Sequence, residues 1–361
     1  KGIPMPTNGE VPGAQPLFFA RNRVARVYDG GKLFADFFGD APVDGKQPEE
    51  WIASTVRALN RDSADPDEGL SRMEGTDLTF RDLLAQHKDA LLGPREGFEV
   101  LVKALDSAIR LPVQTHPDPA FSRKHFHSPF GKTEMWLVLQ TRPDACIYFG
   151  FHERLTKAAF AEAVARSETD RDALEPLLNR IPVRPGEVYL IPSRCVHAIG
   201  AGCLMLEVQE PTDFTIQPEH WCGDYRLNAQ EMYLGLDPDT ALDCFDYDVF
   251  GAGAERLTRR EPRLVAEADG CRVESLIDGR DAPCFGVRRI TLSGARCALD
   301  QAPALYVITG GEGELRWEGG VRPVRRGAYF FLPYNLRGKA ALLAQGRLEA
   351  VCCLPPERAP A

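Results

Sequence analysis

Short apolar stretches recur along most of this chain, each rich in Val, Leu, Ile or aromatic residues and bounded by Gly or Pro. Such stretches are typical of β-strands, and the Gly and Pro residues between them mark turns. Many short strands with this punctuation predict a β-sandwich or barrel, so we expect a mainly β protein. The clearest expected strands are 100–107, 111–117, 134–140, 187–193 and 203–210.

Two segments in the first half have the apolar spacing of helices and are expected as insertions between strands. The first is 80–92, which is followed by Gly93, and the second is 156–179, with a break near Ser167. The first twenty residues are rich in Pro and Gly and are expected to lie as an arm over the surface.

The chain has 361 residues, enough for two domains that each bury a core. The segment 250–261, FGAGAERLTRRE, is small and charged and lacks an apolar pattern, which indicates a boundary. We expect residues 1–250 to form one β domain that carries the helices. Residues 251–361 are expected to form a smaller, nearly all-β domain.

The charge and cysteine content exclude several classes of partner. The chain carries 43 Lys and Arg against 52 Asp and Glu, a formal net charge of −9, so no nucleic-acid partner is expected. We also expect no membrane partner, because the sequence has neither an apolar span nor a signal-peptide core. The ten Cys are not spaced as zinc knuckles, which indicates free thiols in a reducing compartment. These features predict a cytoplasmic protein, either a monomer or a homodimer.

All seven His residues lie at or before position 220, so imidazole chemistry is expected in the first domain. Gln114 and His116 stand two apart in an expected strand, where such side chains share a face. Glu134 begins another expected strand, and His197 follows a Pro-Gly turn and an apolar strand. One amide oxygen, one carboxylate and two imidazoles suit Zn²⁺ or another first-row divalent ion. Each residue alone is also explained as a hydrogen-bonded structural residue, so only the set predicts a metal site.

Several motifs that surround these residues occur in a fixed order. They are YDGGKL at 28–33, PEEWIAS at 48–54, QTHPD at 114–118, GKTEMW at 131–136 and a Pro-Gly-x5-Pro-x4-His turn that ends at His197. In this order they resemble the type I phosphomannose isomerases, which are metal-dependent mannose-6-phosphate isomerases of the cupin superfamily. The resemblance is close over about residues 20–210 and loose over the C-terminal part.

The resemblance implies two cupin-like β-sandwich (jelly-roll) units, the first with helical insertions and the metal, the second without metal ligands. By position, the metal ligands fall on Gln114, His116, Glu134 and His197. One divalent ion is implied, by preference Zn²⁺, with Mn²⁺, Co²⁺ and Fe²⁺ as the other candidates. Lys132 matches a lysine that the family uses to bind substrate or phosphate.

The resemblance also implies an enzyme, a metal-dependent aldose–ketose isomerase that passes through an enediol. By default its pair is mannose 6-phosphate and fructose 6-phosphate, so the partner is a small sugar or sugar phosphate. Since Glu134 is committed to the metal, the base is expected to be Lys132, Glu210 or Asp213. A phosphate clamp would combine Lys132 with one of Arg184, Arg194 and Arg226.

The run 210–217, EPTDFTIQ, departs from the family pattern. The family carries a catalytic Arg there, and Gln217 stands in its place. Gln has no positive charge for an enediolate oxygen or a phosphate, so Arg194 or Arg226 would have to take that role. A metal-containing cupin that binds sugars as a non-catalytic or regulatory module is therefore the alternative function. A cupin oxygenase is a weaker alternative, because redox iron favours His-rich ligand sets.

Overall fold

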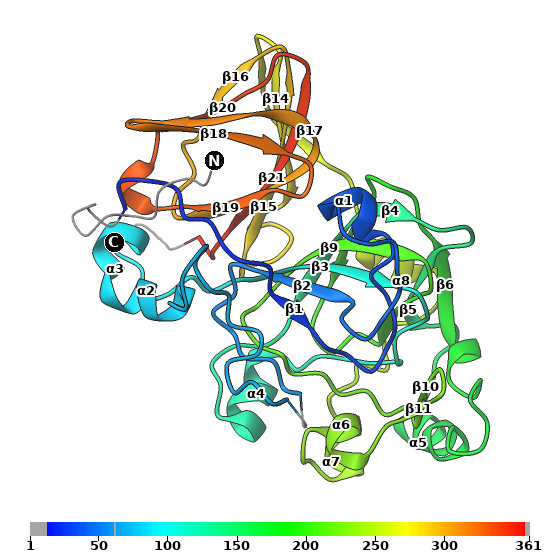
Figure 1. Ribbon diagram of the computed structural model, residues 1–361. Helices are drawn as coiled ribbons and strands as arrows, with labels where there is room; N and C mark the ends of the chain where they lie inside the picture. The colour runs from blue at the N-terminus through cyan, green and yellow to red at the C-terminus, as the bar shows by residue number, and fades with distance from the viewer. Residues whose placement is uncertain (1–12, 61–62, 358–361) are drawn as a thin grey trace.

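A seven-stranded sheet forms the centre of the first of two lobes in the computed structural model, which describes residues 13–60 and 63–357 (Figure 1). Its strand order, β1-β2-β3-β9-β4-β7-β12, makes neighbours of strands that are far apart in the sequence. The strands are β1 (Arg23–Val24), β2 (Glu49–Ile52), β3 (Leu101–Ser107), β4 (Glu134–Thr141), β7 (Val188–Ile191), β9 (Cys203–Gln209) and β12 (Arg259–Arg260). A three-stranded sheet in the order β6-β5-β8 belongs to the same lobe. It consists of β5 (Cys146–Phe151), β6 (Leu178–Pro182) and β8 (His197–Ile199), and a separate ribbon pairs β10 (Trp221–Cys222) with β11 (Tyr225–Arg226).

Strands β3 and β9 are buried along their whole length, which explains their nearly continuous apolar sequences. Their side chains enter two different cores, because successive residues of a strand point to opposite faces. Met205 joins Phe149 in the core between the seven-stranded and three-stranded sheets. Leu204 and Leu206 join a second core, which also contains Phe331 of the second lobe. The seven-stranded sheet is therefore covered on both faces.

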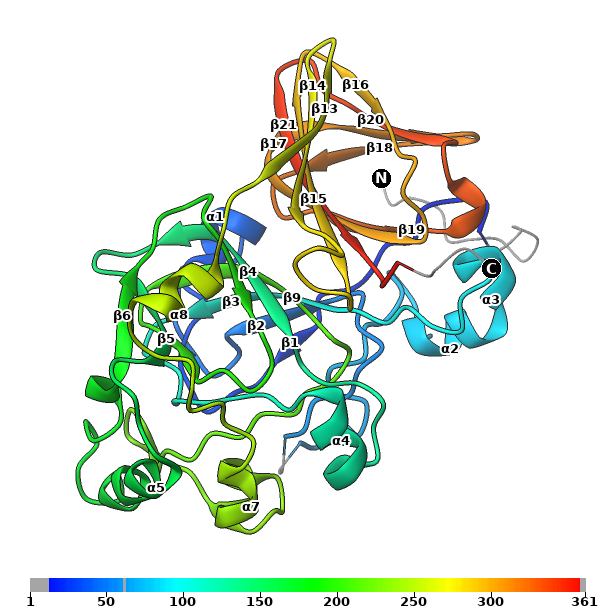
Figure 2. The same ribbon diagram turned by 180° about the vertical axis from the view of Figure 1, so that it is seen from behind.

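The second lobe is a nine-stranded sheet that follows the first lobe in the sequence (Figure 2). Its longest strand, β17, has 14 residues and pairs with β18, β19, β20 and β21, so the sheet folds around it and encloses its own core. The strands are β13 (Arg263–Ala268), β14 (Cys271–Ile277), β15 (Gly286–Ser293), β16 (Arg296–Ala298), β17 (Ala304–Trp317), β18 (Gly320–Arg325), β19 (Tyr329–Leu332), β20 (Ala340–Leu343) and β21 (Arg347–Leu354).

The helices are short insertions between strands. They are α1 (Phe34–Phe38), α2 (Phe80–Gln86), α3 (Lys88–Leu92), α4 (Pro119–Phe126), α5 (Lys157–Arg166), α6 (Ala229–Tyr233), α7 (Pro238–Leu242) and α8 (Gly251–Thr258), with 3₁₀ turns η1 (Glu175–Leu177) and η2 (Tyr334–Leu336). The expected helix 80–92 is interrupted at His87, whose backbone leaves the helical region. Gly93 ends α3 with φ 62°, and a Cβ added there would lie 2.6 Å from the Tyr334 ring. This end of α3 therefore packs closely against the second lobe.

Other sequence expectations are corrected by the structure. The second expected helix ends at Ser167, and its remainder becomes η1 and the start of β6. The expected strand 111–117 is irregular and pairs only through bridges at Gln114 and Thr115. Strands β3, β4, β7 and β9 lie where the sequence predicted them.

The segment 250–261, expected as a boundary, forms α8 and β12. Strand β12 pairs with β7, so this segment is attached to the sheet of the first lobe. The expected arm crosses between the lobes, because Leu17 pairs with Phe331 whereas Phe19 pairs with Met73. Residues 1–12 of that arm lie outside the described part of the chain.

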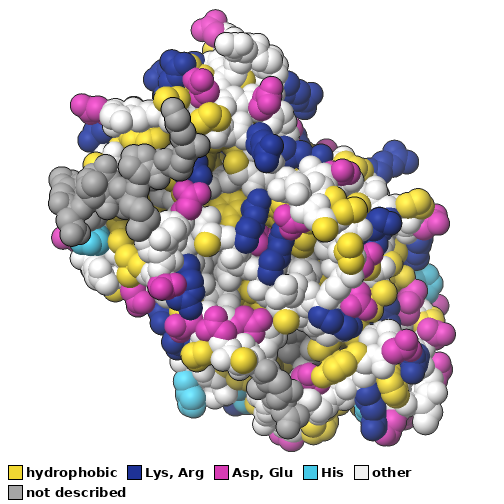
Figure 3. All heavy atoms as spheres, viewed as in Figure 1, with side chains coloured by type: hydrophobic (Ala, Val, Ile, Leu, Met, Phe, Trp, Pro, Cys, Tyr) yellow, Lys and Arg dark blue, Asp and Glu magenta, His cyan; other side chains and the backbone are white. Residues whose placement is uncertain are grey.

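All ten cysteines are free thiols, as the sequence predicted. Among the described residues, no helix is long and apolar enough to cross a membrane. On the face shown in Figure 3, Lys and Arg side chains are interspersed with Asp and Glu side chains.

Candidate metal centre

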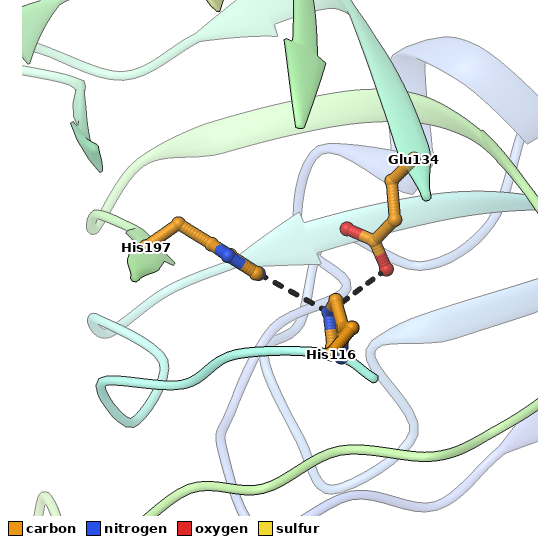
Figure 4. A group of neighbouring side chains, drawn as sticks. All are labelled: His116, Glu134 and His197. Atoms are coloured by element: carbon orange, nitrogen blue, oxygen red, sulfur yellow. Dashed lines mark hydrogen bonds and ion pairs between the residues drawn. The ribbon is translucent and has the colours of Figure 1, made fainter. Parts of the chain in front are cut away.

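His116, Glu134 and His197 meet at one point of the first lobe (Figure 4). Glu134 is the first residue of β4 and His197 the first of β8, whereas His116 lies in the irregular segment that precedes α4. The Nε2 atom of His116 lies 3.1 Å from His197 Nε2 and 3.1 Å from Glu134 Oε1. All three side chains are buried.

Hydrogen bonds on the far side of each ring orient the two imidazoles. His116 Nδ1 lies 2.9 Å from the Phe214 carbonyl oxygen, and His197 Nδ1 lies 2.9 Å from the Cys195 carbonyl oxygen. Because a carbonyl only accepts, each Nδ1 carries the proton and each Nε2 presents a lone pair. Burial lowers the pKa of His116 to about 3 and that of His197 to about 4, so both rings are neutral at pH 7.

Two bare imidazole nitrogens and a carboxylate oxygen that lie within 4.8 Å of one another favour a cation between or beside them. The Lys132 ammonium supplies one, since Nζ lies 3.0 Å from Glu134 Oε1 and 3.2 Å from His116 Nε2. Burial acts to raise the pKa of Glu134, but the Lys132 ammonium outweighs it and holds that pKa well below its usual range. These three donors therefore fit a divalent metal ion, which prefers such a mixed N and O set.

Gln114 lies directly opposite His197 in an antiparallel bridge. Side chains of such a pair project to the same side of the pair. Gln114, His116 and Glu134 all line one cavity. The role of Gln114 as a fourth ligand stays a prediction.

The cavity has a volume of about 550 Å³ and is lined by charged and amide side chains together with a similar number of apolar and aromatic ones. Its described cations are Arg26, Lys103 and Lys132, and its described carboxylates are Glu49, Glu134, Glu207, Asp213 and Glu231. Its amides are Asn60, Gln114, Gln217 and Gln230. A cavity of this size and lining beside a metal-capable group is suited to a small polyhydroxylated molecule.

One row of side chains crosses four adjacent strands on the cavity side. Trp51 of β2, Lys103 of β3, Glu207 of β9 and Trp136 of β4 are successive register partners. Lys103 Nζ lies 3.1 Å from Glu207 Oε1, and Trp136 Nε1 donates to Glu207 Oε2 at 3.0 Å. Burial raises the pKa of Glu207, and the neighbouring Glu134 raises it further. Sequence reasoning missed Lys103 and Glu207, although each is a charged residue inside an otherwise apolar strand.

Arg26 was also missed, because it lies close to a two-residue strand with no recognisable motif. Its guanidinium contacts Glu49 through Nε at 3.1 Å, Asn60 through Nη1 at 3.1 Å and Asp213 through Nη2 at 2.9 Å. Burial acts to lower the pKa of Arg26, but Asp213 and Glu49 outweigh it and raise that pKa. Arg26, which follows β1, therefore holds together the segments of the cavity wall that contain Glu49, Asn60 and Asp213.

Two of the four predicted catalytic residues line the cavity. Lys132 lies within the metal-capable group, and Asp213 accepts hydrogen bonds from Arg26 and from the Leu59 backbone N–H at 2.8 Å. Glu210 is not among the described residues that line it. Its carboxylate accepts from the backbone N–H groups of Gly131 at 3.1 Å and Thr133 at 2.9 Å. Glu210 thus anchors the segment that carries Lys132, which is a structural role and not the predicted catalytic one.

The prediction that Arg194 reaches the site needs correction as well. Its side chain is 41% exposed, donates to the Cys244 and Asp243 carbonyls and lies outside the described lining of the cavity. Only its backbone serves the site, because its N–H donates to the His116 carbonyl at 2.7 Å.

The other arginines considered for a clamp also point elsewhere. Arg226 pairs with Glu168 at the surface, and Arg184 is exposed. Gln217, by contrast, lines the cavity, and its Nε2 donates to the Glu231 carbonyl at 3.1 Å. The structure therefore places an amide, not a cation, at this wall.

Comparison with known proteins places this geometry in context. No family model matches the chain. The mannose-6-phosphate isomerase ManA of Bacillus subtilis is 30% identical over 328 residues, which cover 89% of this chain and 94% of that protein. The mannose-6-phosphate isomerase of Streptococcus mutans is 27% identical over 333 residues, 90% of this chain and 94% of that protein.

Solved structures show the same fold. The crystal structure of the mannose 6-phosphate isomerase from Bacillus subtilis has a TM-score of 0.73 at 24% identity and covers 94% of this chain and 99% of that one. The apo form of the Salmonella typhimurium mannose 6-phosphate isomerase has a TM-score of 0.70 at 16% identity and covers 95% of this chain and 99% of that one. The expected fold class, mainly β with cupin-like units, is thereby confirmed.

Proposed function

Because the chain belongs to the mannose-6-phosphate isomerase family, we propose that it is an aldose–ketose isomerase whose metal is held by His116, Glu134 and His197. Its relatives are named mannose-6-phosphate isomerases, so mannose 6-phosphate and fructose 6-phosphate are the substrate and product that we propose by default. The convergence of these three donors, of which His116 and Glu134 line a cavity of about 550 Å³, carries the proposal.

We assign the Gln114 amide oxygen as the fourth ligand, because Gln114 pairs with His197 and lines the cavity together with His116. Two imidazoles with two oxygen ligands favour Zn²⁺, and Mn²⁺, Co²⁺ and Fe²⁺ also accept such a set. When bound, the ion supplies a Lewis acid for the oxygens on the first two sugar carbons.

The isomerisation moves a proton between C1 and C2, so it needs a base and a group that stabilises the developing negative oxygen. Lys132 is suited to the second task, because its ammonium stands at the metal-capable group and faces the cavity. Asp213 is the carboxylate among the sequence candidates that lines the cavity, and we assign it the role of base. Its contact with Arg26, at 2.9 Å, orients the carboxylate.

A coupled isomerase assay on the metal-loaded protein, with a panel of phosphorylated and free sugars, tests this function. Ketose formation from a mannose-type aldose is expected. A matched pair of variants links the activity to the site. His197→Ala should abolish turnover, whereas His152→Ala, at an exposed position, should leave it unchanged. Sugar binding without turnover of any sugar would instead support a non-catalytic sugar-binding module.

A further inference from the structure

We propose that Thr215 is a further catalytic residue of the isomerase. Its hydroxyl accepts a hydrogen bond from the Lys132 ammonium and donates one to the sugar oxygen that becomes negative as the enediolate forms. This inference rests on the proposed function and deepens it, because it adds a hydrogen-bond donor beside Lys132 and Asp213.

Thr215 stands next to the metal-capable group. Its Oγ1 lies 3.2 Å from Lys132 Nζ, and that Nζ lies 3.0 Å from Glu134 Oε1 and 3.2 Å from His116 Nε2. Thr215 lines the same cavity as these three residues. Its hydroxyl is therefore at the end of the cavity where the oxygens on the first two sugar carbons are expected.

The direction of this hydrogen bond decides where the Thr215 proton points. A lysine ammonium only donates, whereas a hydroxyl both accepts and donates. In the contact with Lys132, Thr215 Oγ1 is therefore the acceptor, and its O–H is directed away from the ammonium. Because the side chain lines the cavity, a sugar oxygen bound there can accept from this O–H.

The three N–H groups of the Lys132 ammonium match three acceptors, which are the Glu134 carboxylate, His116 Nε2 and the Thr215 hydroxyl. A developing oxyanion is attracted by the charge of Lys132, but a direct hydrogen bond from the ammonium would replace one of these contacts. Thr215 avoids this exchange, because its O–H reaches the oxygen while Oγ1 keeps its contact with Nζ. A hydroxyl that accepts from a cation is also polarised and therefore donates more strongly.

The residues on both sides of Thr215 are fixed to the segment that carries His116. The Phe214 carbonyl oxygen lies 2.9 Å from His116 Nδ1, and Ile216 exchanges both backbone hydrogen bonds with Thr115, at 2.8 and 3.0 Å. Ile216 is buried in the core of the first lobe, whereas its neighbour Thr215 lines the cavity. The hydroxyl is thus a preorganised donor, which needs no rearrangement when charge develops on the sugar.

The first test separates the hydroxyl from the shape of the side chain, with all variants compared at equal metal content. Thr215→Val keeps the shape and should lower kcat for mannose 6-phosphate about tenfold to 100-fold, the range expected for one hydrogen bond to a charged group. Thr215→Ser keeps the hydroxyl and should remain close to the parent. Thr169→Val, at an exposed position outside the described lining of the cavity, is the matched control. Parental kcat in Thr215→Val, or a Thr215→Ser variant that is equally slow, overturns the inference.

The second test measures binding by calorimetry, with an aldonohydroxamate phosphate whose adjacent oxygens imitate the enediolate. Its Kd should rise at least about tenfold in Thr215→Val, whereas the Kd of mannose 6-phosphate should change little, because the charge develops only during the reaction. Equal hydroxamate Kd values in parent and variant overturn the inference but leave the isomerase function intact. If the parent turns over no sugar, the isomerase function fails, and a raised hydroxamate Kd still supports Thr215 as the oxyanion donor. A parent that does not bind the hydroxamate overturns both.

The third test asks whether Thr215 acts only by holding the ammonium in place. In that case Thr215→Val would have no further effect once Lys132→Met has removed the ammonium. A hydroxyl that donates to the sugar still contributes, so the double variant should bind the hydroxamate more weakly than Lys132→Met alone. Equal Kd values for the single and double variants would make Thr215 a positioning residue for Lys132 and overturn its assignment as a catalytic residue.

Discussion

Gln114 and His197, 83 positions apart in the sequence, exchange both of their backbone hydrogen bonds, each at 2.9 Å. Directly opposed residues of an antiparallel pair project to one side, so the bridge directs the Gln114 amide and the His197 imidazole to the same side. The Arg194 N–H fixes the neighbouring His116 carbonyl in the same way. Backbone pairing therefore helps to bring the residues of the candidate metal centre together.

Replacement of a metal donor should remove the ion. We expect His197→Ala and Gln114→Ala to lower the metal bound per chain, measured by elemental analysis after dialysis. Loss of a direct ligand should cost more than the about 10-fold to 100-fold that loss of an outer partner costs in affinity. His152→Ala, at an exposed position, serves as the control. Full metal occupancy in both His197→Ala and Gln114→Ala would contradict the assignment.

Lys132→Met should lower kcat and leave the metal content unchanged. The ammonium lies 3.0 Å from Glu134, where it can also stabilise a developing oxyanion. Loss of such a group typically costs about 100-fold to 1,000-fold in kcat. Lys157→Met, which breaks a surface pair with Asp243, is the matched control and should behave as the parent. A Lys132→Met enzyme with parental kcat would remove Lys132 from the mechanism.

Acidification should destabilise the metal-free protein through its two buried imidazoles. Burial lowers the pKa of His116 to about 3 and of His197 to about 4, against about 6.5 in the unfolded chain. Between these values the unfolded state binds more protons, so the free energy of unfolding falls as the pH falls. The stabilising contribution is complete above pH 6.5 and is lost progressively towards pH 4.

The expected slope is about 1.4 kcal/mol per pH unit for each histidine. Urea unfolding at a series of pH values from 7 to 4.5, on protein treated with a chelator, measures it. In the His197→Asn variant, the slope of the free energy of unfolding against pH should be smaller by the contribution of one histidine. A free energy of unfolding that stays constant in the parent between pH 6.5 and 4.5 would refute the neutral state of the two rings.

Arg26→Leu should destabilise the fold, because it leaves the buried Asp213 carboxylate without its cation and leaves Glu49 with only Lys103, at 3.8 Å. Loss of one partner of a buried pair typically costs about 3–5 kcal/mol. Chemical denaturation gives the change in the free energy of unfolding. Arg57→Leu, which breaks an exposed pair with Asp67, is the control and should leave the midpoint nearly unchanged. Equal denaturation midpoints for the two variants would mean that the ion pairs of Arg26 do not stabilise the fold.

Much of the fold could be predicted because strand signals are local. The strands that carry Glu134 and His197 begin at those residues, and the apolar runs of β3 and β9 predicted their burial. Where long-range packing decides conformation, local reasoning was wrong. The helical pattern after Ser167 became η1 and β6, because Leu178 and Ile181 complete the core with β5.

The sequence by itself determined the four candidate ligands, since motif order and residue chemistry are properties of the chain alone. Only the tertiary structure decided which charges surround them. It brought Arg26, Lys103 and Glu207 to the cavity and turned Arg194 and Glu210 away from it. The reason is the strand order β2-β3-β9-β4, which aligns residues up to about 150 positions apart in one cross-strand row. No local pattern encodes the neighbour that a strand acquires across a sheet.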